Sequence, residues 1–72
     1  MLSERLKSLR LEAKITQKEI SNKLEIGQGT YARYEKGDRK PTGEILNDLA
    51  KFFNVSTDYL LGNTDIKSKN LE

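Results

Sequence analysis

The chain contains no cysteine and no histidine among its 72 residues. Disulfides, thiolate metal sites, cysteine nucleophiles and imidazole bases are therefore excluded, and most zinc and iron sites with them. No metal or other cofactor is expected. The absence of cysteine also fits a reducing compartment, and we expect the protein to act in the cytoplasm.

Long apolar runs are missing as well. The first ten residues, MLSERLKSLR, hold only scattered apolar side chains, unlike the continuous apolar core of a signal peptide. No stretch approaches the roughly 20 apolar residues that a membrane-spanning helix needs. The sequence therefore predicts a soluble protein with no membrane segment. A chain of 72 residues makes one domain with a small core.

The apolar residues that are present recur three and four residues apart, which is the spacing of one face of an α-helix. The stripe that runs from Leu2 to Ala13 predicts a first helix of about three turns, opened by Ser3. Thr16 and Glu19 have the spacing of a capping box, in which each side chain binds the other residue's backbone N–H. They predict a second helix over roughly residues 17–24.

Capping and stopping residues predict three further helices, because Ser, Thr and Gly favour helix starts and Gly favours the left-handed end. None of these short helices is stable alone in water, so they bury their apolar stripes against one another. The sequence predicts a compact all-α domain of five helices over residues 1–62. Residues 63–72 are expected to be a polar tail or a truncated linker. The three further helices run from Gly27 to Gly37, from Thr42 to Phe53, and from Ser56 or Thr57 to Gly62.

The second and third expected helices are separated only by residues 25–28, with the sequence EIGQ. Two helices joined by so short a turn cross at a steep angle, and in a helix-turn-helix the second one enters the major groove of DNA. Gln pairs with adenine, Arg with guanine, and a Thr methyl contacts the thymine methyl. Residues suited to reading base edges stand near the start of the third helix: Gln28, Gly29, Thr30 and Arg33.

The net charge of +2 is weak evidence for nucleic-acid binding. The distribution of charge says more, because residues 33–40, RYEKGDRK, hold four cations and two anions, beginning with Arg33 itself. On this stretch alone, a solvated loop of mixed charge and a DNA-binding segment are about equally favoured.

Several pieces occur together in the order of a known family. They are Ile15-Thr16-Gln17, the YEKG of residues 34–37, Pro41, and FNVSTDYLLG at residues 53–62. The chain resembles, over residues 2–62, the Cro/C1-type helix-turn-helix of phage repressors and Xre-like bacterial regulators. The resemblance implies a lambda-repressor-like fold and sequence-specific binding of double-stranded DNA without a cofactor.

The resemblance also implies roles for particular residues. Gln17 matches a glutamine that binds a backbone phosphate and packs against the first glutamine of the recognition helix, here Gln28. Arg10 and Glu35 match an ion pair that ties the first helix to the third, and we interpret this pair as structural. Residues at base-reading positions are Gln28, Gly29, Thr30 and Arg33, and residues at phosphate-contacting positions are Lys36, Arg39 and Lys40.

Two residues depart from the family pattern. Glu25 stands where many relatives have glycine, and a side chain at positive φ costs roughly 1 kcal/mol. The turn therefore either differs in shape or accepts strain. Gly29 stands where relatives often have a hydrogen-bonding side chain, so it either permits close backbone approach or leaves the reading to its neighbours.

The family most often represses by steric cover of promoter DNA, as a dimer on a palindromic operator, with the dimer contact expected around residues 54–61. We expect a repressor; activation from the same fold is common, and the residues do not separate the two. A competing hypothesis is a protein-interaction module, such as an antitoxin or anti-repressor, which predicts an exposed apolar patch. An enzyme is the weakest alternative, because no nucleophile and base can be assembled without His or Cys.

Overall fold

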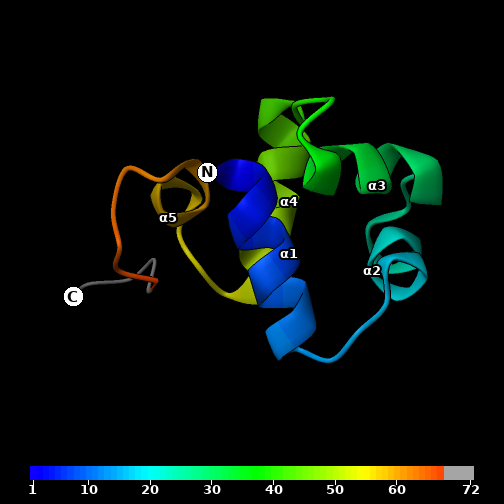
Figure 1. The fold of residues 1–72 in the computed structure, drawn as a ribbon, viewed down its shortest axis with the longest axis horizontal. Coiled ribbons are helices and arrows are strands. Elements are labelled where there is room, and N and C mark those ends of the chain that lie inside the picture. The colour runs from blue at the N-terminus through cyan, green and yellow to red at the C-terminus, as the bar shows by residue number, and fades with distance from the viewer. Residues whose placement is uncertain (68–72) are drawn as a thin grey trace.

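The computed structural model describes residues 1–67 of the chain, and this part contains five α-helices and no strand (Figure 1). The predicted all-α, five-helix fold is therefore confirmed. The helices are α1 (Leu2–Glu12), α2 (Gln17–Leu24), α3 (Gln28–Lys36), α4 (Gly43–Phe53) and α5 (Thr57–Leu61). No helix within residues 1–67 is both long and apolar enough to cross a membrane.

Most helix starts follow the predicted capping residues. Thr16 Oγ1 accepts the backbone N–H of Glu19 at 3.0 Å, and Glu19 Oε1 accepts that of Thr16 at 2.7 Å, so the capping box is formed. Thr42 caps α4, and Ser56, one of the two candidates, caps α5. The exception is α1.

The expectation that Ser3 opens α1 is wrong. The helix begins at Leu2, and its N-cap residue Met1 makes no side-chain capping bond. The carbonyl of Met1 already accepts the backbone N–H of Arg5 at 3.0 Å, so the first turn closes before Ser3 is reached. The far end of the predicted stripe also differs: Ala13 follows the last helical residue, Glu12, and is exposed.

The core lies where the helices meet. Both α1 and α2 pack against α3, and α5 packs against α1 and α4 (Figure 1). Tyr31 is completely buried, as its expected place in the core requires, and Phe53 packs against the core from a partly buried position. The buried apolar residues are Leu6, Leu9, Ile20, Tyr31, Tyr34, Leu49, Ala50, Val55 and Leu60.

The segment after α5 contacts α1. Arg5 stacks over the ring of Tyr59 at 4.1 Å and donates to the carbonyl oxygens of Tyr59 at 2.7 Å and Thr64 at 2.6 Å. It also pairs with Asp65 at 2.8 Å. These contacts place residues 63–65, the start of the expected tail, against α1 and α5. The last five residues of that tail, 68–72, lie outside the described part of the chain.

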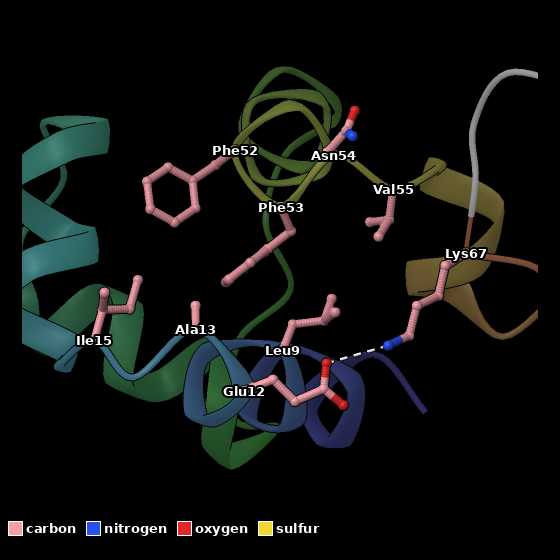
Figure 2. Close-up of a pocket in the computed structure, with 9 residues that line it drawn as sticks. All are labelled: Leu9, Glu12, Ala13, Ile15, Phe52, Phe53, Asn54, Val55 and Lys67. Carbon is pink, nitrogen blue, oxygen red and sulfur yellow. Dashed lines mark hydrogen bonds and ion pairs between the residues drawn. The ribbon is translucent and has the colours of Figure 1, made fainter.

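An open groove of about 480 Å³ lies between the end of α1, the loop that follows it and the end of α4 (Figure 2). Its walls are mostly apolar, and the ion pair of Glu12 with Lys67 at 3.1 Å crosses one side. None of the residues expected to touch DNA lines this groove. The apolar lining residues are Leu9, Ala13, Ile15, Phe52, Phe53 and Val55.

The turn after α2 is strained at Glu25, which was one of the two alternatives predicted from the sequence. Glu25 is in the left-handed conformation, with φ 57° and ψ 42°. Its backbone N–H donates to the carbonyl of Asn22 at 3.2 Å, and the next N–H, of Ile26, donates to that of Ser21 at 3.0 Å. These bonds close the end of α2 and hold the backbone of Glu25 in a conformation that favours glycine.

We expect Glu25→Gly to raise the free energy of unfolding by about 0.5 kcal/mol. Removing the side chain relieves roughly 1 kcal/mol of left-handed strain, and the greater freedom of glycine in the unfolded chain offsets part of this gain. Urea denaturation measures the change. Glu25→Ala is the matched control, because it removes the charge and keeps the strain. Equal effects of the two substitutions would assign the change to the charge.

Candidate nucleic-acid interface

The turn between α2 and α3 sets the direction of α3. After the left-handed Glu25, Ile26 is partly buried against the core, and Gly27 is extended, with φ −65° and ψ 142°, as the N-cap of α3. In Figure 1, α2 is seen nearly end-on while α3 runs across the view, so the two helices cross steeply. This arrangement is a helix-turn-helix.

The two faces of α3 differ in chemistry. Tyr31 and Tyr34 are buried on one face. The other face exposes Gly29, Arg33 and Lys36, whose spacing of four and three residues forms one stripe along the helix. Gln28 is also exposed, at the start of the helix, and Thr30 is half-buried. The residues expected to read bases thus lie at or beside one polar surface.

The cations expected to contact phosphates lie at the end of α3 and in the loop that follows. Lys36, Arg39 and Lys40 are all exposed. Lys36 Nζ lies 4.0 Å from Asp38 Oδ2, but the two side chains are 76% and 52% exposed, so water screens the pair strongly. Arg39 and Lys40 form no ion pair within residues 1–67. Their charges are therefore available to an anionic partner.

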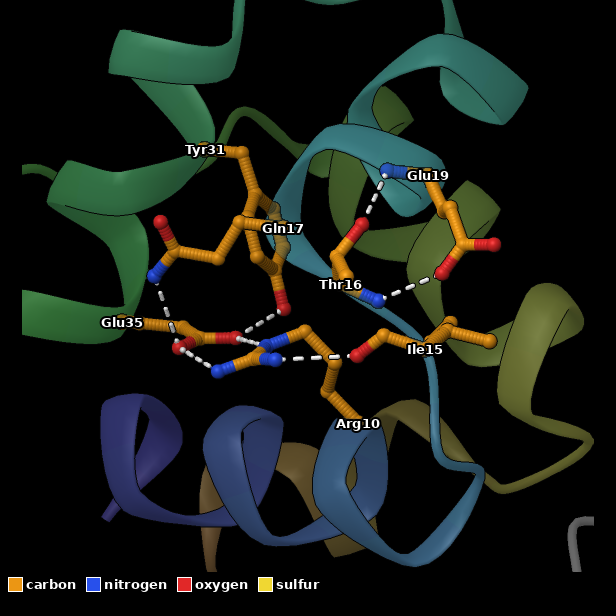
Figure 3. A network of polar contacts seen from close by, with 7 residues as sticks. All are labelled: Arg10, Ile15, Thr16, Gln17, Glu19, Tyr31 and Glu35. Carbon is orange, nitrogen blue, oxygen red and sulfur yellow. Dashed lines mark hydrogen bonds and ion pairs between the residues drawn. The ribbon is translucent and has the colours of Figure 1, made fainter.

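Arg10 of α1 and Glu35 of α3 form an ion pair (Figure 3). Arg10 Nε donates to Glu35 Oε2 at 2.6 Å, and Nη2 donates to Oε1 at 3.2 Å, which makes the pair bidentate. The two side chains are only 12% and 4% exposed. Arg10 Nη1 also donates to the carbonyl of Ile15 at 2.9 Å. The pair thus links α1 to α3 and to the loop before α2.

Two further donors converge on Glu35. Tyr31 donates its hydroxyl to Oε2 at 2.6 Å, and Gln17 Nε2 donates to Oε1 at 3.1 Å (Figure 3). Within residues 1–67, Gln17 and Gln28 form no hydrogen bond with each other. The amide of Gln17 is bound to Glu35 instead. Neither bond was predicted from the sequence. The spacing of four residues between Tyr31 and Glu35 on one helix is a signal for the first, and no local pattern indicates the second.

The network decides the charge states of its members. Burial alone would raise the pKa of Glu35, but hydrogen bonds from Arg10, Tyr31 and Gln17, with the charge of Arg10, hold it below its ordinary value. Burial raises the pKa of Tyr31, and the bond to Glu35 raises it further. The hydrogen bond to Glu35 raises the pKa of Arg10. Near neutral pH, Glu35 is therefore a carboxylate, Arg10 a guanidinium cation and Tyr31 a neutral phenol.

Comparison with known proteins gives consistent matches. A protein-family model described as helix-turn-helix matches residues 6–60. The chain is 45% identical over 69 residues to the HTH-type transcriptional regulator ImmR of Bacillus subtilis (strain 168), covering 96% of this chain and 54% of ImmR. It is 35% identical over 65 residues to the cryptic phage CTXphi transcriptional repressor RstR of Vibrio cholerae, covering 90% of this chain and 59% of RstR.

A third relative is named an activator. The chain is 30% identical over 64 residues to the HTH-type transcriptional activator BcrR of Enterococcus faecalis, covering 89% of this chain and 31% of BcrR. The chain thus spans about half the length of ImmR and RstR, and about a third of BcrR.

Proposed function

Because the chain belongs to the helix-turn-helix family and to its Cro/C1-type, Xre-like group of regulators, we propose that it binds a palindromic operator as a dimer and represses transcription. We expect a DNA-binding regulator and not an enzyme, in line with the names of its relatives. Residues 1–62 would form the DNA-binding domain, with α3 in the major groove. Repression is the proposed outcome because RstR is named a repressor.

The exposed polar stripe of α3 is the observation that carries this proposal. A protein-interaction module predicts an exposed apolar patch, whereas this face presents an amide, a guanidinium and an ammonium group, which suit DNA. In the major groove, Gln28 would pair with adenine and Arg33 with guanine, and the Thr30 methyl would meet a thymine methyl. Lys36, Arg39 and Lys40 would contact the phosphates that flank the groove.

Gly29 has a role in this proposal that packing does not explain. A Cβ built on Gly29 meets no atom within 4 Å, and its φ is not positive. The fold therefore has space for a side chain there, although glycine inside a helix costs roughly 0.5–1 kcal/mol relative to alanine. We assign Gly29 to DNA binding: its missing side chain lets the start of α3 approach the base pairs closely.

Dimerisation would pair two recognition helices on one operator. The face around residues 54–61 is the proposed contact, and its exposed apolar side chain is Leu61, at 44% exposure. A contact this small would be weak without DNA. Two-fold pairing would set the half-sites about 34 Å apart, which is one turn of the double helix.

Selection from a random duplex pool, followed by native mass spectrometry of the complex, tests both parts of the proposal. We expect enrichment of a two-fold symmetric motif and two protein chains per selected duplex. One chain per full site would contradict the dimer and leave DNA binding intact. Failure to enrich any sequence would contradict specific DNA binding and favour the interaction module.

A further inference from the structure

Gln17, which is expected to contact DNA, is bonded to the buried ion pair of Arg10 and Glu35. It is the first residue of α2, it is half-buried, and its side chain reaches Glu35 on α3. Figure 3 shows the amide of Gln17 pointing toward the Glu35 carboxylate, beside the guanidinium of Arg10. A residue expected to contact a phosphate is thus held by the carboxylate of Glu35, whose side chain is only 4% exposed.

The chemistry of the partner decides which way the amide of Gln17 faces. An ionised carboxylate only accepts hydrogen bonds, so the nitrogen of the amide, and not its oxygen, must face Glu35. One proton of Nε2 is used in this bond, at 3.1 Å from Nε2 to Oε1. The second proton of Nε2 has no partner within residues 1–67. Phosphate oxygens also only accept, so this second proton is the group of Gln17 that suits a phosphate.

We propose that Glu35 is a positioning residue for DNA binding: by fixing the amide of Gln17, it aims the second Nε2 proton at a backbone phosphate. The proposal rests on the DNA-binding function proposed above. A glutamine side chain has several rotatable bonds, and holding them in place before binding reduces the entropy lost on binding. The bidentate guanidinium of Arg10 offsets the negative charge of Glu35, which would otherwise repel phosphates.

The two oxygens of Glu35 supply a matched control. Gln17 binds Oε1, whereas Tyr31 binds Oε2. Tyr31→Phe therefore removes one bond to Glu35 without touching the bond to Gln17. The replacement Glu35→Gln affects Gln17 directly. The oxygen of the new amide should stay at the Oε2 position, because the two shortest bonds, from Arg10 Nε and the Tyr31 hydroxyl, are both made there at 2.6 Å. The NH₂ group would then take the Oε1 position, where it faces two donors, Gln17 Nε2 and Arg10 Nη2. The amide of Gln17 would reverse, so that an oxygen would point toward the phosphate.

The experiment is a double-mutant cycle in DNA affinity, using the duplex selected by the unmodified protein and conditions where circular dichroism shows every variant folded. We expect Gln17→Ala to weaken binding roughly tenfold, as for a hydrogen bond to a charged group. Glu35→Gln should weaken binding several-fold when Gln17 is present and cause no further loss in the Gln17→Ala background. Tyr31→Phe should lower stability and leave affinity unchanged. Gln17→Ala should leave the salt slope constant, because Gln17 carries no charge.

Different outcomes separate the positioning role from the proposed function. Equal losses from Glu35→Gln with and without Gln17, or an equal loss from Tyr31→Phe, would overturn the positioning role. Unweakened binding by Gln17→Ala would overturn it as well, while leaving DNA binding in place. Failure of the unmodified protein to select a duplex would overturn both.

A second readout needs no variant that could fail to fold. In nuclear magnetic resonance spectra of the unmodified protein, one side-chain proton of Gln17 should exchange with water more slowly than the other. Equal and fast exchange of both protons would overturn the inferred hold of Glu35 on Gln17.

Discussion

Replacing Arg10 by Met should lower the free energy of unfolding by about 3 kcal/mol, the lower end of the range for breaking a buried ion pair. The Glu35 side chain is only 4% exposed, so its carboxylate would stay in the protein interior without its cation. A domain of 72 residues has a net stability of only a few kcal/mol. The variant should therefore be close to its unfolding midpoint without denaturant, which urea titration would show.

A double-mutant cycle separates the ion pair from other effects of Arg10. Glu35→Gln removes the charge that Arg10→Met would strand, so the double variant should cost less than the sum of the single variants. Asp65→Asn is the matched control. Asp65 pairs with Arg5 but is 96% exposed, so its loss should cost at most about 1 kcal/mol. Strictly additive losses for Arg10 and Glu35 would show that the pair is not a coupled unit.

The same network should appear in the pH dependence of stability. Because the pKa of Glu35 is lower in the folded protein than its ordinary 4.5, the folded state favours the ionised form. This stability is present in full above about pH 4.5 and is lost as the pH falls through the lowered, folded-state pKa. Below pH 4.5 the unmodified protein should lose stability more steeply than the Glu35→Gln variant. Parallel acid profiles would contradict a lowered pKa of Glu35.

Replacing Gln28 or Arg33 by Ala should weaken binding to the selected operator by roughly 1–3 kcal/mol each, which is the range for a bidentate contact to a base edge. Binding to random duplex should change little, so the ratio of the two affinities should fall. Both side chains are exposed on α3, and their removal leaves the core intact. Titrations with operator and scrambled duplex, at several salt concentrations, measure the ratio.

Replacing Lys36, Arg39 or Lys40 by Ala supplies the contrasting result. Each change should weaken operator and random duplex alike, and should reduce the slope of log affinity against log salt by about 1. Lys36 should behave like the other two, because water screens its 4.0 Å contact with Asp38 strongly. If Gln28→Ala and Arg33→Ala leave the affinity ratio unchanged, α3 is not the reading element, and the protein-interaction hypothesis becomes the better one.

The sequence alone determined the helices and most of their ends, because these depend on local physics. Apolar spacing, the box of Thr16 with Glu19, and the stops at Gly37 and Gly62 act within one or two turns of helix. Gly37 and Gly62 are indeed left-handed, with φ of 88° and 84°. The start of α1 differs from the predicted one because the backbone carbonyl of Met1 opens that helix without a capping side chain.

Only the tertiary structure decided what surrounds Glu35 and the exposed face of α3. Gln17 and Glu35 are 18 residues apart in the chain, and Arg10 and Glu35 are 25 apart. The pairing of Arg10 with Glu35 was implied by the family resemblance. No local rule, however, brings the amide of Gln17 to the same carboxylate. That contact exists because the turn through Glu25 and Gly27 sets a steep angle between α2 and α3, and both helices pack against the core. Side-chain partners set by helix crossing become visible only once the helices are placed in space.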